Sequence, residues 1–277
     1  TNYYFEIEEE SGIKRYGKSK EHRPNPIVTM GLFMDADGIP LAFDLFPGNQ
    51  NEQTTLKPLE SRILQDFGCS EFVFCSDAGL GSASNRRFNS LGSRAYVITH
   101  SLKKMKQEDR DIALNPAQFR KVGSGHFIDL RSLNEKDEDV FNSIYYKEVP
   151  LVTGSMDETL IVTYSPKYKA YQRKIRARQI ERAKKILETP GRKHKGKNQN
   201  DPMRFVKKTS VTSEGEIAEN SIYEIDAVLI QNEELYDGFY AVVTNLEGDV
   251  GEILKINRQR WEIEENFRIM KSEFEAR

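Results

Sequence analysis

The order of short apolar segments in the first 100 residues constrains the fold more than any other feature of this sequence. Strand-like runs rich in aromatic and β-branched residues occupy residues 1–9, 27–35, 39–46, 71–76 and 95–99. Helical spacing predicts one helix ending near residue 67, capped by Thr54 or Thr55, and a shorter one over residues 83–91. The order of three strands, helix, strand, helix and strand predicts an α/β sheet that begins with a hairpin.

Two local signals refine this expectation. Asp37-Gly38 lies between the second and third runs and supplies the positive φ angles of a tight hairpin turn. Residues 71–76 are a short continuous apolar run, which is typical of a central strand covered on both faces.

The rest of the chain has a different pattern. Residues 101–235 are irregular and polar, with strand-like segments at 145–151 and 159–164 and a basic helix over 165–189. We interpret this region as a β-rich insertion subdomain. A strand over 239–245 and a long helix over 250–275 follow, so residues 1–100 and 236–277 are expected to form one core.

Composition excludes several classes of protein. No segment approaches the roughly 18 apolar residues of a membrane span, and no secretion signal opens the chain. Cys69 and Cys75 are too few for a disulfide framework, and we expect two thiols in a reducing, cytoplasmic setting without membrane contact.

Positive charge is concentrated in one segment. Residues 166–197 hold 13 Lys and Arg against two Glu, which gives +11 in a chain whose net charge is −2. Such a stripe suits a phosphate backbone, although a solvated charged helix with a basic tail is the alternative. Tyr164, Tyr168 and Tyr171 are interleaved with it and could stack on bases or simply pack. The candidate DNA-binding residues are Arg173, Lys174, Arg176, Arg178, Arg182, Lys184 and Lys185.

Two acidic residues are candidates for catalysis. Asp77 follows the apolar run 71–76, and ligand sites in open α/β sheets form beyond the carboxyl ends of strands. Metal binding and capping of the following turn remain equally open for Asp77.

In the last helix, the apolar stripe places Glu264 at its edge beside Arg260 and Lys271. Glu262 and Glu265 are expected to point further towards solvent, and a surface ion pair of Arg260 with Glu264 is the alternative for this helix.

The segment from Asn257 to Lys271 resembles the signature helix of DDE transposases of the insertion-sequence-four type. That signature is Tyr, two residues, Arg, three residues, Glu, six residues and Lys. Here Arg260, Glu264 and Lys271 match, and Asn257 replaces the Tyr. Residues 37–49, 75–85 and 237–246 resemble other segments of the same family in the same order.

The resemblance implies a ribonuclease-H-like α/β fold, in which a mixed sheet flanked by helices is interrupted by an insertion. Its first three strands would be antiparallel, and the others would join in parallel. It also implies two Mg²⁺ or Mn²⁺ ions about 3.5–4 Å apart, with Asp77 and Glu264 as the second and third carboxylate ligands. Asn257, Arg260 and Lys271 would contact DNA. The implied activity is cleavage and transfer of DNA strands, with transposon ends and target DNA as partners and a homodimer on DNA.

The family's first Asp has no counterpart in this sequence. The segment 1–6 resembles the part of the family's first strand that comes after this Asp, which would lie two residues before Thr1. We therefore expect a catalytic-core fragment. The alternative is a non-catalytic DNA-binding remnant that occupies element ends or inhibits the intact enzyme. A ribonuclease-H-like nuclease unrelated to transposition is a third interpretation, which the Arg, Glu and Lys spacing disfavours.

Overall fold

The computed structural model describes residues 1–19, 24–68, 71–189, 200–211 and 220–272. The chain divides into two compact units. Unit 1 comprises Thr1–Lys104, Glu148–Val162 and Ala241–Arg277, and unit 2 comprises Met105–Lys147 and Thr163–Tyr240. Among the described residues, no helix is both long and apolar enough to cross a membrane.

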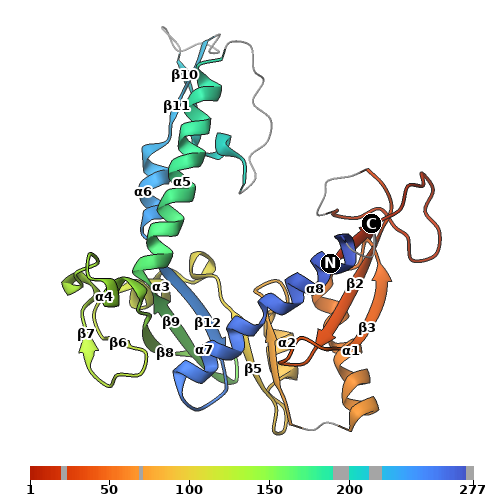
Figure 1. Ribbon diagram of the computed structural model, residues 1–277. Coiled ribbons are helices and arrows are strands. Elements are labelled where there is room, and N and C mark those ends of the chain that lie inside the picture. The colour runs from red at the N-terminus through yellow and green to blue at the C-terminus, as the bar shows by residue number, and fades with distance from the viewer. Residues whose placement is uncertain (20–23, 69–70, 190–199, 212–219, 273–277) are drawn as a thin grey trace. The chain divides into compact units, whose positions relative to one another are not determined.

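Unit 1 begins with a three-stranded antiparallel sheet in the order β1-β2-β3 (Figure 1). Its strands are β1 (Asn2–Tyr4), β2 (Ile27–Met34) and β3 (Pro40–Pro47). The predicted hairpin is confirmed, and Gly38 in its turn has a φ of 82°. The first strand is shorter than residues 1–9, because the amide of Ile7 donates to the carbonyl of Phe5 and turns the backbone away.

Helix α1 (Glu52–Phe67) packs on one face of this sheet. A Cβ on Gly31 would lie 3.2 Å from the Leu59 side chain, so helix and strand approach closely there. The predicted helix is confirmed, but its cap is Asn51, whose side chain accepts from the amide of Gln53 at 3.0 Å. Asn51 takes this role rather than Thr54 or Thr55 because the helix starts earlier.

Strand β3 also carries a row of exposed apolar side chains. The exposed fractions are 58% for Ile39, 40% for Leu41, 56% for Phe43 and 44% for Leu45. Alternate residues of a strand point to the same face, so these four side chains form one row. The guanidinium of Arg62 on α1 donates to the carbonyl of Phe43 at 3.2 Å.

A second, mixed sheet has seven strands in the order β4-β5-β12-β9-β8-β6-β7. The strands are β4 (Val73–Ser76), β5 (Ala95–Thr99), β12 (Phe239–Thr244), β9 (Met156–Tyr164), β8 (Tyr145–Thr153), β6 (Phe119–Lys121) and β7 (Phe127–Ile128). With its flanking helices, this sheet makes the protein a mixed α/β fold, which confirms the predicted class.

Two topological expectations are wrong. The strand predicted from residues 71–76 is β4, and in the described sheet it lies at an edge rather than in the centre. Strands β4 and β5 are parallel, but β12 joins β5 antiparallel. The apolar run does not fix the number of strand neighbours, since β4 buries Phe74 and Ser76 on one face while Val73 on the other is 38% exposed. Strands β1–β3 form a sheet of their own.

The predicted helix over residues 250–275 is two helices, α7 (Val250–Gln259) and α8 (Trp261–Ser272), separated at Arg260. Helix α7 buries Ile253 and Leu254 and packs against β4 and β5. Helix α8 instead contacts the three-stranded sheet, where Asn266 donates to the carbonyl of Gly38 at 3.4 Å. The apolar residues therefore keep one helical period through both helices, although α7 and α8 pack on different sheets.

Unit 2 is built around a long helix and a hairpin. Its helical elements and its two further strands are α3 (Gln107–Leu114), η2 (Leu130–Ser132), α4 (Glu138–Asn142), α5 (Pro166–Leu187), η3 (Pro202–Phe205), β10 (Val206–Val211), β11 (Asn220–Ile225) and α6 (Ala227–Glu234). Helix α5 packs on the β10–β11 hairpin through a small core of Ala183, Met203 and Val206 (Figure 1). The region expected to be β-rich is therefore mixed. Helices α3 and α4 bury at most one residue each, so they leave no apolar stripe in the sequence.

Candidate catalytic site and DNA interface

Asp77 directly follows β4, as the sequence predicts. Its side chain is exposed, and its Oδ1 atom accepts a hydrogen bond from the amide of Gly79 at 2.8 Å. This bond is an Asx turn, in which a carboxylate closes the backbone turn that follows it. Within the described residues, the Oδ2 atom accepts no hydrogen bond, so Asp77 caps its turn and still presents one oxygen to solvent.

The start of α8 lies close to the same strand. The thiol of Cys75 on β4 donates to the carbonyl of Ile256 on α7 at 3.7 Å. Burial raises the pKa of Cys75 to about 11, and the nearby positive charge of Arg260 acts in the opposite direction. Arg260, which separates α7 from α8, is therefore near the strand that ends at Asp77.

Glu264 does not lie where the helical stripe predicts. Its side chain is 77% exposed and lies 3.9 Å from the Nη1 atom of Arg260, which is the ion pair considered as the alternative. Glu262 is half-buried instead, and its Oε2 atom would lie 3.3 Å from a Cβ on Gly38. The expectation that Glu264 borders the core is wrong, because α8 packs on the hairpin turn with a different face.

The other two positions of the signature helix are also placed. Asn257 is 9% exposed on the buried face of α7, which argues against a direct DNA contact by its side chain. Lys271 lies with its ammonium 5.6 Å from the centre of the Tyr3 ring on β1. Arg260, whose side chain is 26% exposed, and Lys271 are thus partly accessible, whereas Lys255, Arg258 and Arg268 are the exposed cations of this helix pair.

The donor chemistry of Asp77 and Glu264 fits a hard divalent ion. Both are exposed carboxylates, and Mg²⁺ prefers oxygen ligands with room for water and phosphate. Within the part of the chain that the structure describes, no three His, Cys, Asp or Glu side chains gather where they could hold a metal ion. The fit of Asp77 and Glu264 to a metal ion therefore rests on their carboxylate chemistry and exposure alone.

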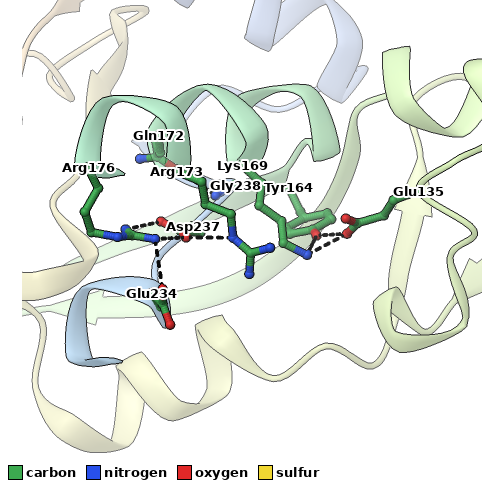
Figure 2. A network of polar contacts seen from close by, with 9 residues as sticks. All are labelled: Glu135, Tyr164, Lys169, Gln172, Arg173, Arg176, Glu234, Asp237 and Gly238. Atoms are coloured by element: carbon green, nitrogen blue, oxygen red, sulfur yellow. Dashed lines mark hydrogen bonds and ion pairs between the residues drawn. The ribbon is translucent and has the colours of Figure 1, made fainter. Parts of the chain in front are cut away.

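Helix α5 is anchored near its middle by a buried ion pair (Figure 2). The two terminal nitrogens of Arg176 donate to the two oxygens of Asp237 at 2.7 and 2.5 Å. The side chains are 8% and 4% exposed, respectively. Arg173 adds a contact to Asp237 at 3.2 Å, and Glu234 lies 3.5 Å from Arg176. Arg176 is therefore buried in an ion pair within unit 2, and not exposed on the basic helix as the charge pattern predicts.

Further polar contacts fix the first turns of α5 (Figure 2). Lys169 and the hydroxyl of Tyr164 both donate to Glu135, at 2.7 and 2.5 Å. Gln172 accepts from the amide of Gly238 at 2.7 Å. Gly238 has a φ of 85°, and a Cβ there would lie 2.8 Å from the Tyr164 ring, so glycine is required. Tyr164 therefore packs rather than stacks on a ligand.

The opposite side of α5 is an exposed basic face. Its exposed cations are Lys167, Lys174, Arg178, Arg182 and Lys185, with Arg173 and Lys184 at the margin. The rings of Tyr168 and Tyr171 stack beside it, 6.4 Å apart and 19° from parallel. Tyr171 is 59% exposed. The remaining cations of the segment, Arg192, Lys193, Lys195 and Lys197, lie outside the described residues, as does Cys69.

Sequence reasoning missed a group of buried polar residues around α2 (Ala83–Phe88). They are Glu60, Asn85, Arg86, Asn89 and Glu158. Asn85 ends the family-like segment 75–85, so the motif contained it without indicating a role. The burial of the others is not indicated by the sequence, because polar and charged residues are normally expected at the surface.

Unit 1 presents an exposed carboxylate beyond the end of β4, where ligand sites of α/β sheets form, and unit 2 presents a basic helix of the kind that suits a phosphate backbone. Residues 5–277 match the model of the family described as the transposase DDE domain, and the chain belongs to that family. Searches among curated proteins and among solved structures return no match. Membership implies DNA binding and transposase chemistry, and DDE transposase domains generally use divalent metal ions.

Proposed function

We propose that this chain is the catalytic region of an insertion-sequence-four type transposase, which cleaves and transfers DNA strands with Mg²⁺ or Mn²⁺. The family match over residues 5–277 carries the proposal. In this proposal, residues 1–100 and 236–277 form a ribonuclease-H-like core and residues 101–235 form its insertion.

Asp77 and Glu264 provide two of the three carboxylates of the metal site in this proposal. The third carboxylate of the family maps to no residue of this sequence. Two divalent ions would activate the attacking oxygen and stabilise the leaving oxygen of the phosphodiester. The exposed position of both carboxylates supports the proposal, since ligands must remain accessible to substrate.

Arg260 and Lys271 would contact phosphates near the bond that is cut. Arg260 lies 3.9 Å from Glu264 and balances its charge. If Glu264 held a cation, this pairing would weaken and the guanidinium, with its forked donors, would be available to a phosphate.

The basic face of α5 would hold the DNA backbone outside the site of chemistry. Its cations are exposed and share one helix, which suits neutralisation of successive phosphates. Transposon ends and target DNA are the proposed partners, with a homodimer forming on DNA.

A second candidate is a DNA-binding protein without catalysis, which would occupy element ends or inhibit an intact transposase. The observation that favours it is that no group of three metal-binding side chains occurs among the described residues. The two candidates share DNA binding and differ in metal-dependent cleavage.

The test uses the variants Asp77→Asn and Glu264→Gln, with Glu265→Gln as the matched control. Glu265 neighbours Glu264 but pairs with Arg268 on the surface of the same helix. Mn²⁺ binding is followed by electron paramagnetic resonance, and DNA binding and cleavage by labelled duplexes carrying the ends of the element.

We expect Asp77→Asn and Glu264→Gln to weaken Mn²⁺ binding and abolish any Mg²⁺-dependent cleavage, while Glu265→Gln behaves as wild type. DNA binding with no cleavage and no Mn²⁺ binding by the wild type would favour the non-catalytic candidate. Equal Mn²⁺ affinity in all four proteins would contradict the assigned ligands.

A further inference from the structure

The loop that carries Asp77 makes only weak hydrogen bonds between its own backbone groups. It joins β4 to α2 through residues 77–82. Besides the Asx turn, its hydrogen bonds between backbone groups are long: the amide of Leu80 lies 3.4 Å from the carbonyl of Asp77, and that of Gly81 lies 3.5 Å from the carbonyl of Ala78. Hydrogen bonds of this length are weak, so other groups must fix the loop.

Asn85 on α2 supplies one such group. Its side chain is almost fully buried, with the residue 2% exposed. The Nδ2 atom donates to the carbonyl of Leu80 at 2.9 Å and to that of Gln53 on α1 at 3.1 Å. Asn85 therefore connects the Asp77 loop to α1 with two hydrogen bonds of normal length.

Arg86 supplies a second group. Its Nη1 atom donates to the carbonyl of Gly81 at 3.1 Å. Its Nε atom lies 2.7 Å from the carboxylate of Glu158, a side chain with no exposed surface. The hydroxyl of Tyr96 on β5 donates to Glu158 on β9, so the carboxylate that pairs with Arg86 is itself fixed by a hydrogen bond.

Helix α2 is fixed from its other end as well. Asn89, which is fully buried, donates to both oxygens of Glu60 on α1 at 2.9 and 3.1 Å. The loop also fits tightly against β5, because a Cβ on Gly81 would lie 2.8 Å from the side chain of Ile98. Helix α2 is thus a rigid support for the loop.

We infer that Asn85 and Arg86 are positioning residues, which hold the loop so that the Asp77 carboxylate is fixed for metal binding. The inference rests on the proposed function for its metal and on the hydrogen bonds above for its geometry. Groups that orient a metal ligand typically change metal affinity by about 10- to 100-fold when they are removed.

The test compares Asn85→Ala and Arg86→Lys with Arg87→Lys in the full chain. Lysine at position 86 retains a charge for Glu158 but loses the forked donors. Arg87 is the neighbouring arginine of α2, exposed and without a hydrogen bond to the loop, and it serves as the control. Arg86→Lys keeps the inference testable if Asn85→Ala fails to fold.

Two measurements distinguish a failure of this inference from a failure of the proposed function. Hydrogen exchange of the amides of residues 78–82 reports loop order without any metal, and Mn²⁺ titration reports ligand placement. We expect both test variants to accelerate loop exchange and to weaken Mn²⁺ binding about 10-fold or more, with the control unchanged.

Unchanged loop exchange in both test variants would overturn the inference, as would faster exchange with unchanged Mn²⁺ affinity. A wild-type chain that binds no Mn²⁺ would refute the proposed metal site, and with it the positioning role. If the test variants still exchanged faster in that case, Asn85 and Arg86 would anchor the loop without a role in metal binding.

Discussion

Glu60 is a buried carboxyl on α1. It accepts hydrogen bonds from Asn89, at the end of the helix that supports the Asp77 loop, so its ionisation bears on that support. The residue is 2% exposed, and burial raises its pKa to about 7 against the opposing hydrogen bonds from Asn89. A folded-state pKa above the unfolded value favours the protonated form in the fold. The stabilisation is therefore complete below pH 4.5 and is lost as pH rises through 7.

We predict that Glu60→Gln flattens the pH dependence of stability. From the shift, ionisation of Glu60 removes roughly 3 kcal/mol of unfolding free energy between about pH 4.5 and pH 8. The variant cannot ionise and should lose less over this range, even if the amide packs less well at every pH. Urea unfolding at both pH values measures the difference, with exposed Glu52→Gln as the control. An equal loss in wild type and Glu60→Gln would contradict the prediction.

Several individual residues could not be assigned from the sequence. Asp77 at a strand end and the Arg260–Glu264 pair were predictable, because strand ends and i,i+4 spacing are local properties. Arg176 and Asn257 were expected at a DNA surface and are buried. Their burial depends on partners distant in sequence, such as Asp237 for Arg176, which helical periodicity does not reveal.

At the scale of single elements, α5 depends on the pairing of Arg176 with Asp237. We predict that Asp237→Ala destabilises the protein by roughly 3–5 kcal/mol, because it leaves a buried guanidinium without its counter-charge. Replacing both partners with apolar residues, Arg176→Met with Asp237→Leu, should recover much of this loss. Urea unfolding of the single and double variants measures the coupling. A loss below about 1 kcal/mol for Asp237→Ala would indicate that the pair contributes little.

The basic face of α5 gives a second prediction at this scale. The triple variant Lys174→Ala, Arg178→Ala and Arg182→Ala should bind duplex DNA more weakly. Its slope of log affinity against log salt should be shallower by up to about 3, because each phosphate contact contributes roughly 0.9. Fluorescence anisotropy at several salt concentrations measures both quantities.

The matched control removes three exposed cations elsewhere, at Lys103, Lys104 and Lys106. If this variant loses as much affinity and slope as the α5 variant, overall charge rather than the basic face accounts for binding.

Elements with a local signal were predicted well. The strand over residues 95–99 matches β5 residue for residue, and Gly38 has the positive φ angle expected of the turn, whereas Asp37 does not. The division of residues 250–275 into α7 and α8 was not predictable, because both halves keep the same period while packing on different sheets. The edge position of β4 depends on strand pairing, which is a tertiary property.

At the scale of the whole molecule, unit 1 is assembled from three separate stretches of chain. We predict that residues 1–104 alone do not fold, although they contain most of unit 1. They lack β12 and α7, which cover β5 and bury Tyr96, Val97 and Ile98. Amide dispersion in an NMR spectrum of this fragment tests the point. A well-dispersed, native-like spectrum would show that the later segments are not needed.

The row of apolar side chains on β3 has a consequence for how the protein behaves in concentrated solution. An outer strand with exposed apolar residues is a template on which further strands can add, and such edges promote aggregation. Arg62 occupies the carbonyl of Phe43, so an incoming strand would have to displace a guanidinium before it could pair there. The exposed apolar side chains of β3 therefore favour association between copies of the chain, while Arg62 opposes strand pairing at the carbonyl of Phe43.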